Sequence, residues 1–202
     1  MKILISAFAC DPRLGSESYV GYTAVSALAR KHECWVLTSE RNRPILENLR
    51  RSGQLSGNLH FSYLGSDFAY HPNRLFARCQ NWLEYRDFTN ALLPLATKLH
   101  RQIGFDLAHH ITITTWRIGI PLWKLGIPFI WGPIGGGEKF PAQFYSTTSP
   151  GTWLFESARS CSNWIGPLNR SVRDTARNAA HIFVSNQETP VSYTHLTLPT
   201  KA

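Results

Sequence analysis

The sequence lacks any apolar run of the roughly eighteen residues that a membrane-spanning helix needs, so it predicts no such helix. Its start, MKILISAFACDP, lacks the long apolar region and the cleavage site of a signal peptide and is interpreted as a buried first strand. The cysteines form neither a CxxC pair nor a metal-ligand spacing; they are Cys10, Cys34, Cys79 and Cys161. We therefore expect reduced thiols, no metal site and a cytoplasmic location.

Two nucleotide-related motifs are also absent. No GxGxxG follows the first expected strand, which argues against a dinucleotide site. No suitably placed Tyr-x-x-x-Lys occurs, which counts against a Rossmann-type oxidoreductase or epimerase.

Acidic residues are in the minority, with 13 against 21 basic residues and a formal charge of +8. This balance favours anionic partners. The basic residues are scattered and no nucleic-acid-binding signature accompanies them, so nucleic acid is not expected. An anionic membrane surface, contacted peripherally at the inner face of the cytoplasmic membrane, or a phosphate-bearing acceptor fits the charge better.

What the sequence does contain is a regular alternation of short apolar runs and longer amphipathic ones. With 202 residues, 43% of them hydrophobic, the chain can form one globular domain with a core. The alternation predicts an α/β fold, a Rossmann-like parallel sheet flanked by helices. Strands are expected at 2–8, 34–38, 59–64, 106–111, 128–131 and 181–185, and helices at 19–31, 44–51, 75–103, 116–125 and 153–180. Pro94 should bend or divide one helix, and Gly166-Pro167 should break the last.

The final segment, VSYTHLTLPT at residues 191–200, interrupts this alternation. Its back-translation matches a transposon-type sequencing-library adapter, and a codon ending in CT would extend the match into Pro190. We therefore interpret residues 190–202 as a non-native tail and residues 1–189 as the domain. On this interpretation the natural protein is expected to continue beyond the domain.

The loop after the first strand is the first candidate site. In an open parallel sheet, ligands bind beyond the carboxyl ends of the strands, where this loop lies. Gly15 would allow the backbone to approach a phosphate, and the start of the following helix, at Ser16 and Glu17, offers free N–H groups to an anion. The alternative is an ordinary turn in which Ser16 or Ser18 caps the helix.

Two further candidate sites follow later strands. His109 and His110 end a strand and could bind a sugar or act as general acid or base, but neighbours in a strand face opposite ways, so at most one should reach a cleft. The segment WGPIGGGE places Gly135, Gly136, Gly137 and Glu138 at another strand end. Three glycines permit close approach to a ligand, and Glu138 could accept hydrogen bonds from sugar hydroxyls; a tight structural turn is the alternative.

These residues carry a resemblance. MKILISAFACDPRLGSES, with the later HECWVLTSE, is similar to the opening of glycosyltransferase family 4, and HHITITTWRIGIPLWKLGIPFIWGPIGGGE resembles a central stretch of one bacterial subgroup. The similarity spans roughly residues 1–189. It implies the N-terminal, acceptor-side half of a GT-B fold, whose C-terminal half binds a nucleotide-sugar donor and usually carries Glu-x7-Glu.

The resemblance also implies a reaction and roles for the candidate residues. Such enzymes transfer a sugar with retention, generally without a metal or other cofactor, often onto a glycan or lipid-linked acceptor in surface polysaccharide synthesis. Gly15 and Ser16 would lie by the donor diphosphate, and His109 or His110 near the transferred sugar. Glu17 and residues 135–138 would line the acceptor side. Because no donor domain or Glu-x7-Glu is present, we expect the chain alone to transfer no sugar; a non-catalytic nucleotide- or sugar-binding domain is the alternative.

Overall fold

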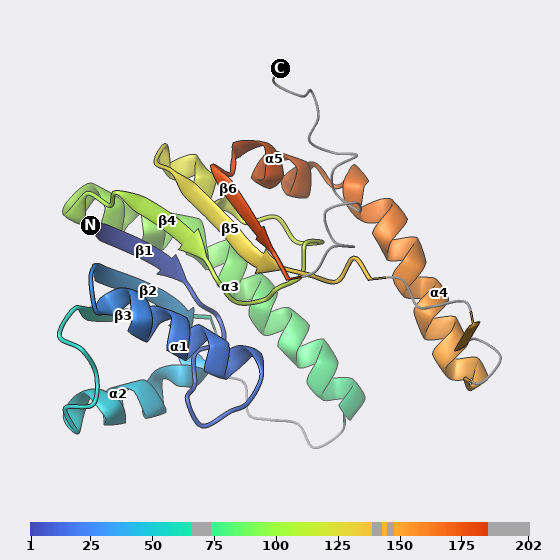
Figure 1. Ribbon diagram of the computed structural model, residues 1–202, viewed down its shortest axis with the longest axis horizontal. Helices are drawn as coiled ribbons and strands as arrows, with labels where there is room; N and C mark the ends of the chain where they lie inside the picture. Colours follow the sequence, from blue (N-terminus) through green and yellow to red (C-terminus); the bar gives the residue numbers. More distant parts are fainter. Residues whose placement is uncertain (66–73, 139–142, 145–147, 186–202) are drawn as a thin grey trace.

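The computed structural model describes residues 1–65, 74–138, 143–144 and 148–185, so the tail interpreted as non-native lies outside the described residues. At its centre is a six-stranded, all-parallel sheet (Figure 1). The strands are β1 (Lys2–Ser6), β2 (Glu33–Ser39), β3 (Leu59–Leu64), β4 (Leu107–His110), β5 (Phe129–Ile134) and β6 (His181–Val184). The α/β, Rossmann-like fold expected from the sequence is therefore confirmed.

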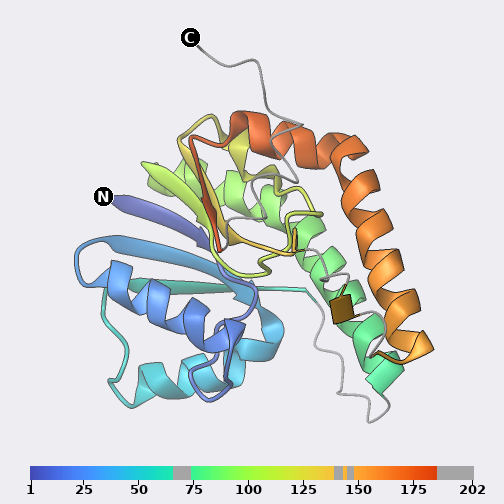
Figure 2. The same cartoon turned by 45° about the vertical axis from the view of Figure 1, so that its right-hand side comes forward.

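Helices cover the two faces of this sheet. The α-helices are α1 (Glu17–Ala29), α2 (Arg43–Arg51), α3 (Arg74–Ile103), α4 (Pro150–Ile165) and α5 (Arg170–Asn178). Short 3-10 helices are η1 (Glu40–Asn42), η2 (Pro121–Leu125) and η4 (Gly166–Leu168). Figure 1 shows α1 and α2 on one side of the sheet and α3 on the other, and α4 lies at the periphery in both views (Figures 1 and 2). None of the helices in the described part of the chain has both the length and the apolar character that crossing a bilayer requires.

The two faces of the sheet bury separate apolar clusters because alternate strand residues point to opposite faces. Ile3 and Ile5 of β1 pack with α1 and α2, whereas Leu4 packs with α3, η2 and α5. The parallel strands are buried on both faces near the centre, which explains their nearly continuous apolar runs.

The order β3-β2-β1-β4-β5-β6 reverses direction between β1 and β4. From β1 the chain proceeds outward through β2 to β3 and then returns through α3 to β4 on the other side of β1. The loops that leave β1 and β4 consequently run in opposite directions. A crevice at such a reversal is where open α/β sheets bind ligands.

The structure differs from two expectations about helices, namely a division at Pro94 and a helix over the whole of 116–125. Pro94 does not divide α3, which continues through it to Ile103; Leu92 and Ala96, both fully buried, pack against the core on either side of the proline and hold the helix together. A helix over residues 116–125 forms only as η2, because Thr115 pairs with Gly135 in a parallel bridge and the chain then turns at residues 116–117, where Trp116 is buried.

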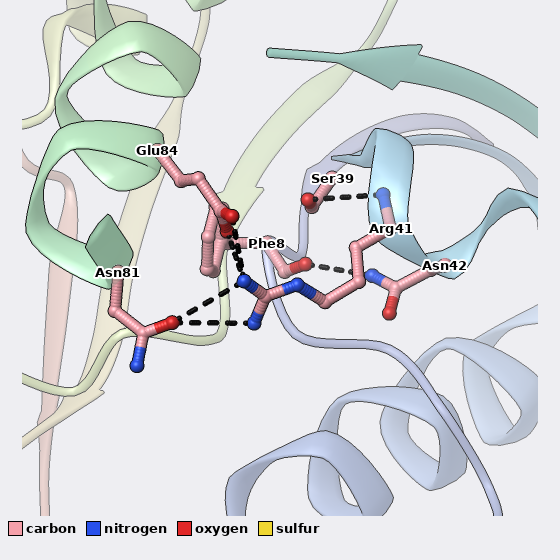
Figure 3. Close-up of polar contacts among 6 residues, drawn as sticks. All are labelled: Phe8, Ser39, Arg41, Asn42, Asn81 and Glu84. Atoms are coloured by element: carbon pink, nitrogen blue, oxygen red, sulfur yellow. Dashed lines mark hydrogen bonds and ion pairs between the residues drawn. The ribbon is translucent and has the colours of Figure 1, made fainter. Parts of the chain in front are cut away.

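A cluster of polar side chains fixes the start of the loop after β1 (Figure 3). The carbonyl oxygen of Phe8 accepts a hydrogen bond from Asn42 Nδ2 at 2.8 Å. Next to it, Arg41 Nη2 donates to both carboxylate oxygens of Glu84 on α3, at 2.5 and 2.6 Å. Glu84 is 2% exposed, so η1 and α3 are joined by an ion pair with one buried member.

We expect Arg41→Ala to lower the free energy of unfolding by about 2–3 kcal/mol, because it leaves the Glu84 carboxylate buried without its cation. Arg43→Ala is the matched control. It breaks the more exposed Arg43–Glu40 pair and should lower the free energy of unfolding by less than about 1 kcal/mol. Urea unfolding of the two variants measures the difference; equal losses would show that burial of Glu84 does not decide the strength of the pair.

Candidate functional site

Three loops meet at the carboxyl edge of the sheet, after β1, β4 and β5. The middle loop, which follows β4, contacts both neighbours through the backbone of Thr114. Its N–H donates to Glu17 Oε1 at 2.7 Å, and its carbonyl oxygen accepts from the N–H of Gly135 at 2.5 Å. Thr115 also pairs with Gly135 in a parallel bridge. The structure therefore brings together the three segments that the sequence singled out.

The loop after β1 leads into α1 through a residue with unusual backbone geometry. Ser16 has φ 57° and ψ −131°, a conformation that L-residues rarely adopt, and its side chain makes no capping hydrogen bond. Ser16 nevertheless occupies the N-cap position that the turn alternative expects, whereas Ser18 lies inside the helix. Gly15 is exposed with open space around it. Residues held in such conformations concentrate at ligand sites.

The same loop is anchored to the middle loop at a second point. The N–H of Ala9 donates to Thr112 Oγ1 at 3.0 Å, and Gly21 of α1 packs against these same two residues. A Cβ atom at Gly21 would overlap the carbonyl oxygen of Ala9, so only glycine allows the helix to approach this closely. Glu17, in the first turn of α1, then connects the helix to Thr114. The start of α1 is thus fixed relative to β4.

The two histidines occupy different environments. His110 is 1% exposed inside the packing of the sheet, with Nδ1 3.0 Å from Ser6 Oγ. Burial is the main reason that its pKa falls from 6.5 to about 3, and the neighbouring His109 adds to the shift. His109 faces the other side and is only partly buried. Of the two candidates, only His109 has a side chain that is not fully enclosed by the packing of the sheet.

The protonation state of His109 follows from its surroundings. Burial lowers its pKa below 6.5, an effect that the hydrogen bond to Gly132 partly offsets, so the ring is neutral at pH 7. Nε2 lies 2.9 Å from the carbonyl oxygen of Gly132. Because a carbonyl oxygen only accepts, Nε2 carries the proton and Nδ1 keeps its lone pair. Nδ1 is therefore a hydrogen-bond acceptor suited to a hydroxyl group.

The glycine-rich loop after β5 is held by the guanidinium of Arg117. Gly136 has φ +91°, and a Cβ atom there would lie 2.9 Å from Arg117 Nη1. Arg117 Nη2 donates to the carbonyl oxygen of Gly136 at 2.6 Å and also to Asn163 Oδ1 on α4. Gly135 and Gly137 are buried, whereas Gly136 and Glu138 are partly exposed. Glycine is favoured at 136 by its backbone conformation, because side chains rarely accept so positive a φ.

Charged side chains surround this cation. Burial lowers the pKa of Arg117, and the nearby Arg159 lowers it further, while Glu138 raises it. Glu138 lies 3.9 Å from Arg159, which also binds Glu156 at 2.7 Å. Arginine stays charged through such shifts, so the loop lies over a fixed positive charge flanked by a carboxylate. An anion or a sugar hydroxyl can be bound there.

Sequence reasoning missed the residues that join the loops, which are Thr112, Thr114 and Asn163. The run ITITT after the histidines was a possible signal, since hydroxyl side chains commonly form hydrogen bonds with the backbone groups of loops. Nothing in the sequence marked Asn163, whose partner Arg117 is distant in the chain. Within the described residues, no group of three or more His, Cys, Asp or Glu side chains is arranged to hold a metal.

The buried His110 should make stability depend on pH. Its pKa is about 3 in the folded protein and about 6.5 when unfolded, so between these values only the unfolded chain binds the proton. Stability is thus lost as the pH falls below 6.5. We expect His110 to contribute a loss of about 2 kcal/mol between pH 7 and pH 5.

The measurement is urea unfolding at the two pH values, for the wild type and for His110→Asn, which does not titrate. The variant should lose about 2 kcal/mol less on acidification than the wild type. Parallel losses in the two proteins would mean that His110 does not carry the effect.

No protein-family model and no curated protein matches the chain. A function is therefore proposed from the geometry of the three loops and from the charge and protonation of their side chains.

Proposed function

We propose that this chain forms the acceptor-side wall of a retaining glycosyltransferase active site, which moves a sugar from a nucleotide-sugar donor to a glycan or lipid-linked acceptor. The observation that carries the proposal is the joining of three loops at the sheet reversal through Thr114. The resemblance of the same three segments to glycosyltransferase family 4 supports it independently of their geometry. The donor is a substrate, and no further cofactor is part of the proposal.

The chemistry of the loops suits such a reaction. In sugar transfer, the bond from the anomeric carbon to the diphosphate oxygen breaks and the nucleoside diphosphate leaves. The acceptor oxygen forms the new bond to the anomeric carbon, and its hydroxyl proton passes to the departing diphosphate oxygen. The backbone of Gly15 and Ser16, at the positive end of α1, is proposed to lie by the diphosphate. Glu17 occupies the same end with a negative charge, but its Oε1 is bound to the N–H of Thr114.

His109 and the glycine-rich loop are proposed to hold sugars. The lone pair on His109 Nδ1 can accept a hydrogen bond from a hydroxyl of the transferred sugar, and the ring does so as a neutral group at pH 7. The backbone of Gly136, held by Arg117, is proposed to face the acceptor sugar, and the Glu138 carboxylate can accept hydrogen bonds from acceptor hydroxyls. His110 is proposed to support the strand rather than to contact substrate, because it is buried.

Titration of the isotope-labelled chain with nucleoside diphosphate sugars, followed by NMR, tests the proposal. Amide shifts should change around Ser16, His109 and Gly136 and stay constant at the opposite edge of the sheet. His109→Ala should weaken binding about three- to tenfold, the value of one neutral hydrogen bond. His60→Ala is the matched control, because His60 is a partly exposed histidine on β3, and it should leave the affinity unchanged.

Shifts confined to other surfaces, or an unchanged affinity in His109→Ala, would contradict the proposed site. A transferase is separated from a non-catalytic binding domain by transfer of a labelled sugar. In a protein that joins this chain to a donor domain, His109→Ala should lower that transfer. Binding that persists without any transfer would favour the non-catalytic alternative.

A further inference from the structure

Helix α4 packs against the domain with its polar side. Glu156, Arg159 and Asn163 recur at helical spacing on this side, and two of them reach the glycine-rich region: Arg159 lies 3.9 Å from Glu138, and Asn163 accepts a hydrogen bond from Arg117. Glu156 is 12% exposed and binds Arg159. An amphipathic helix on a globular protein normally buries its apolar side instead.

The opposite side of α4 is apolar and open to solvent. Trp153 and Trp164 are eleven residues apart, as are Leu154 and Ile165, and this separation is close to three helical turns. Leu168, in the 3-10 helix η4 that follows α4, is a further exposed apolar side chain. The five side chains, here called the α4 apolar stripe, are Trp153 at 54% exposure, Leu154 at 66%, Trp164 at 84%, Ile165 at 59% and Leu168 at 71%.

The stripe lies where a large flat surface can reach it. Figures 1 and 2 both show α4 at the periphery of the molecule, away from the sheet. Only Asn169 separates η4 from helix α5. Helix α5 carries Arg170, Arg173 and Arg177 on one face, away from its buried Val172 and Ala176. Arg170 pairs with Asp174 at 3.7 Å, and within the described residues no acidic side chain forms an ion pair with Arg173 or Arg177.

We propose that the α4 apolar stripe docks this chain onto an anionic lipid bilayer, with the arginines of α5 beside the headgroups. Two tryptophans among aliphatic side chains are typical of helices that lie in the interface of a membrane, where the indole has one apolar body and one polar edge. The basic helix that follows and the net charge of +8 supply the matching attraction. This inference goes beyond the proposed function and does not depend on it.

Co-sedimentation of the 202-residue chain with vesicles tests the inference. The chain should bind vesicles made of equal parts phosphatidylglycerol and phosphatidylcholine at least tenfold more strongly than pure phosphatidylcholine vesicles, and salt should weaken the binding. The double variant Trp164→Ser, Leu168→Ser should reduce binding at least tenfold. Trp82→Ser is the matched control because Trp82 is an exposed tryptophan on α3, and it should bind as the wild type does.

A fluorescent label on Cys161 reports directly on the stripe. Cys161 is exposed on α4 and Cys10 and Cys34 are buried, so a Cys79→Ser background directs an environment-sensitive dye to Cys161. Its emission should shift to the blue with anionic vesicles and remain unchanged without them. Circular dichroism confirms that the variants fold, as expected for changes at exposed positions.

Three results would overturn the inference. One is the absence of binding to anionic vesicles, and another is equal binding by the stripe variant and the wild type. The third is a dimer, seen by sedimentation equilibrium, that Trp164→Ser, Leu168→Ser dissociates while vesicles bind neither protein. In that case a second copy of the chain covers the stripe.

Discussion

The site depends on the hydrogen bonds made by the backbone of one residue, Thr114. Its N–H is bound by a carboxylate from α1 and its carbonyl oxygen by the glycine-rich loop, so both neighbours of the middle loop are held through it. The reversal of strand order makes this possible, because it places the ends of β1, β4 and β5 next to one another with divergent loops. Without these bonds, the polar groups of the loop would lack partners at a partly buried edge.

Electrostatics and burial then separate the roles of similar residues. His109 and His110 are adjacent in sequence, yet one is buried by the core and the other donates to the carbonyl oxygen of Gly132 and keeps an acceptor nitrogen. Arg117 connects the glycine-rich loop to α4, and thereby joins the candidate ligand site to the helix that carries the α4 apolar stripe.

Much of the fold could be predicted because it follows from local periodicity. Strand 59–64 was predicted at its observed bounds, and the break in the last helix at Gly166-Pro167 is present. The details that failed depend on distant contacts: packing of Leu92 and Ala96 holds α3 through Pro94, and pairing with Gly135 keeps residue 115 extended. Thr114 and Glu17 are 97 residues apart, so no local pattern indicates their bond. Periodicity likewise predicts an amphipathic α4, but not that its polar side faces inward.

The central claim is that the three loops form one unit held through Thr114. Amide hydrogen exchange in Glu17→Ala, compared with the wild type, tests it most directly. The substitution removes the bond to the Thr114 N–H and the acidic side chain in the first turn of α1. The account predicts faster exchange at both Thr114 and Gly135, with the amides of β1 and β2 unchanged. Faster exchange at Thr114 alone, with Gly135 as protected as in the wild type, would contradict it.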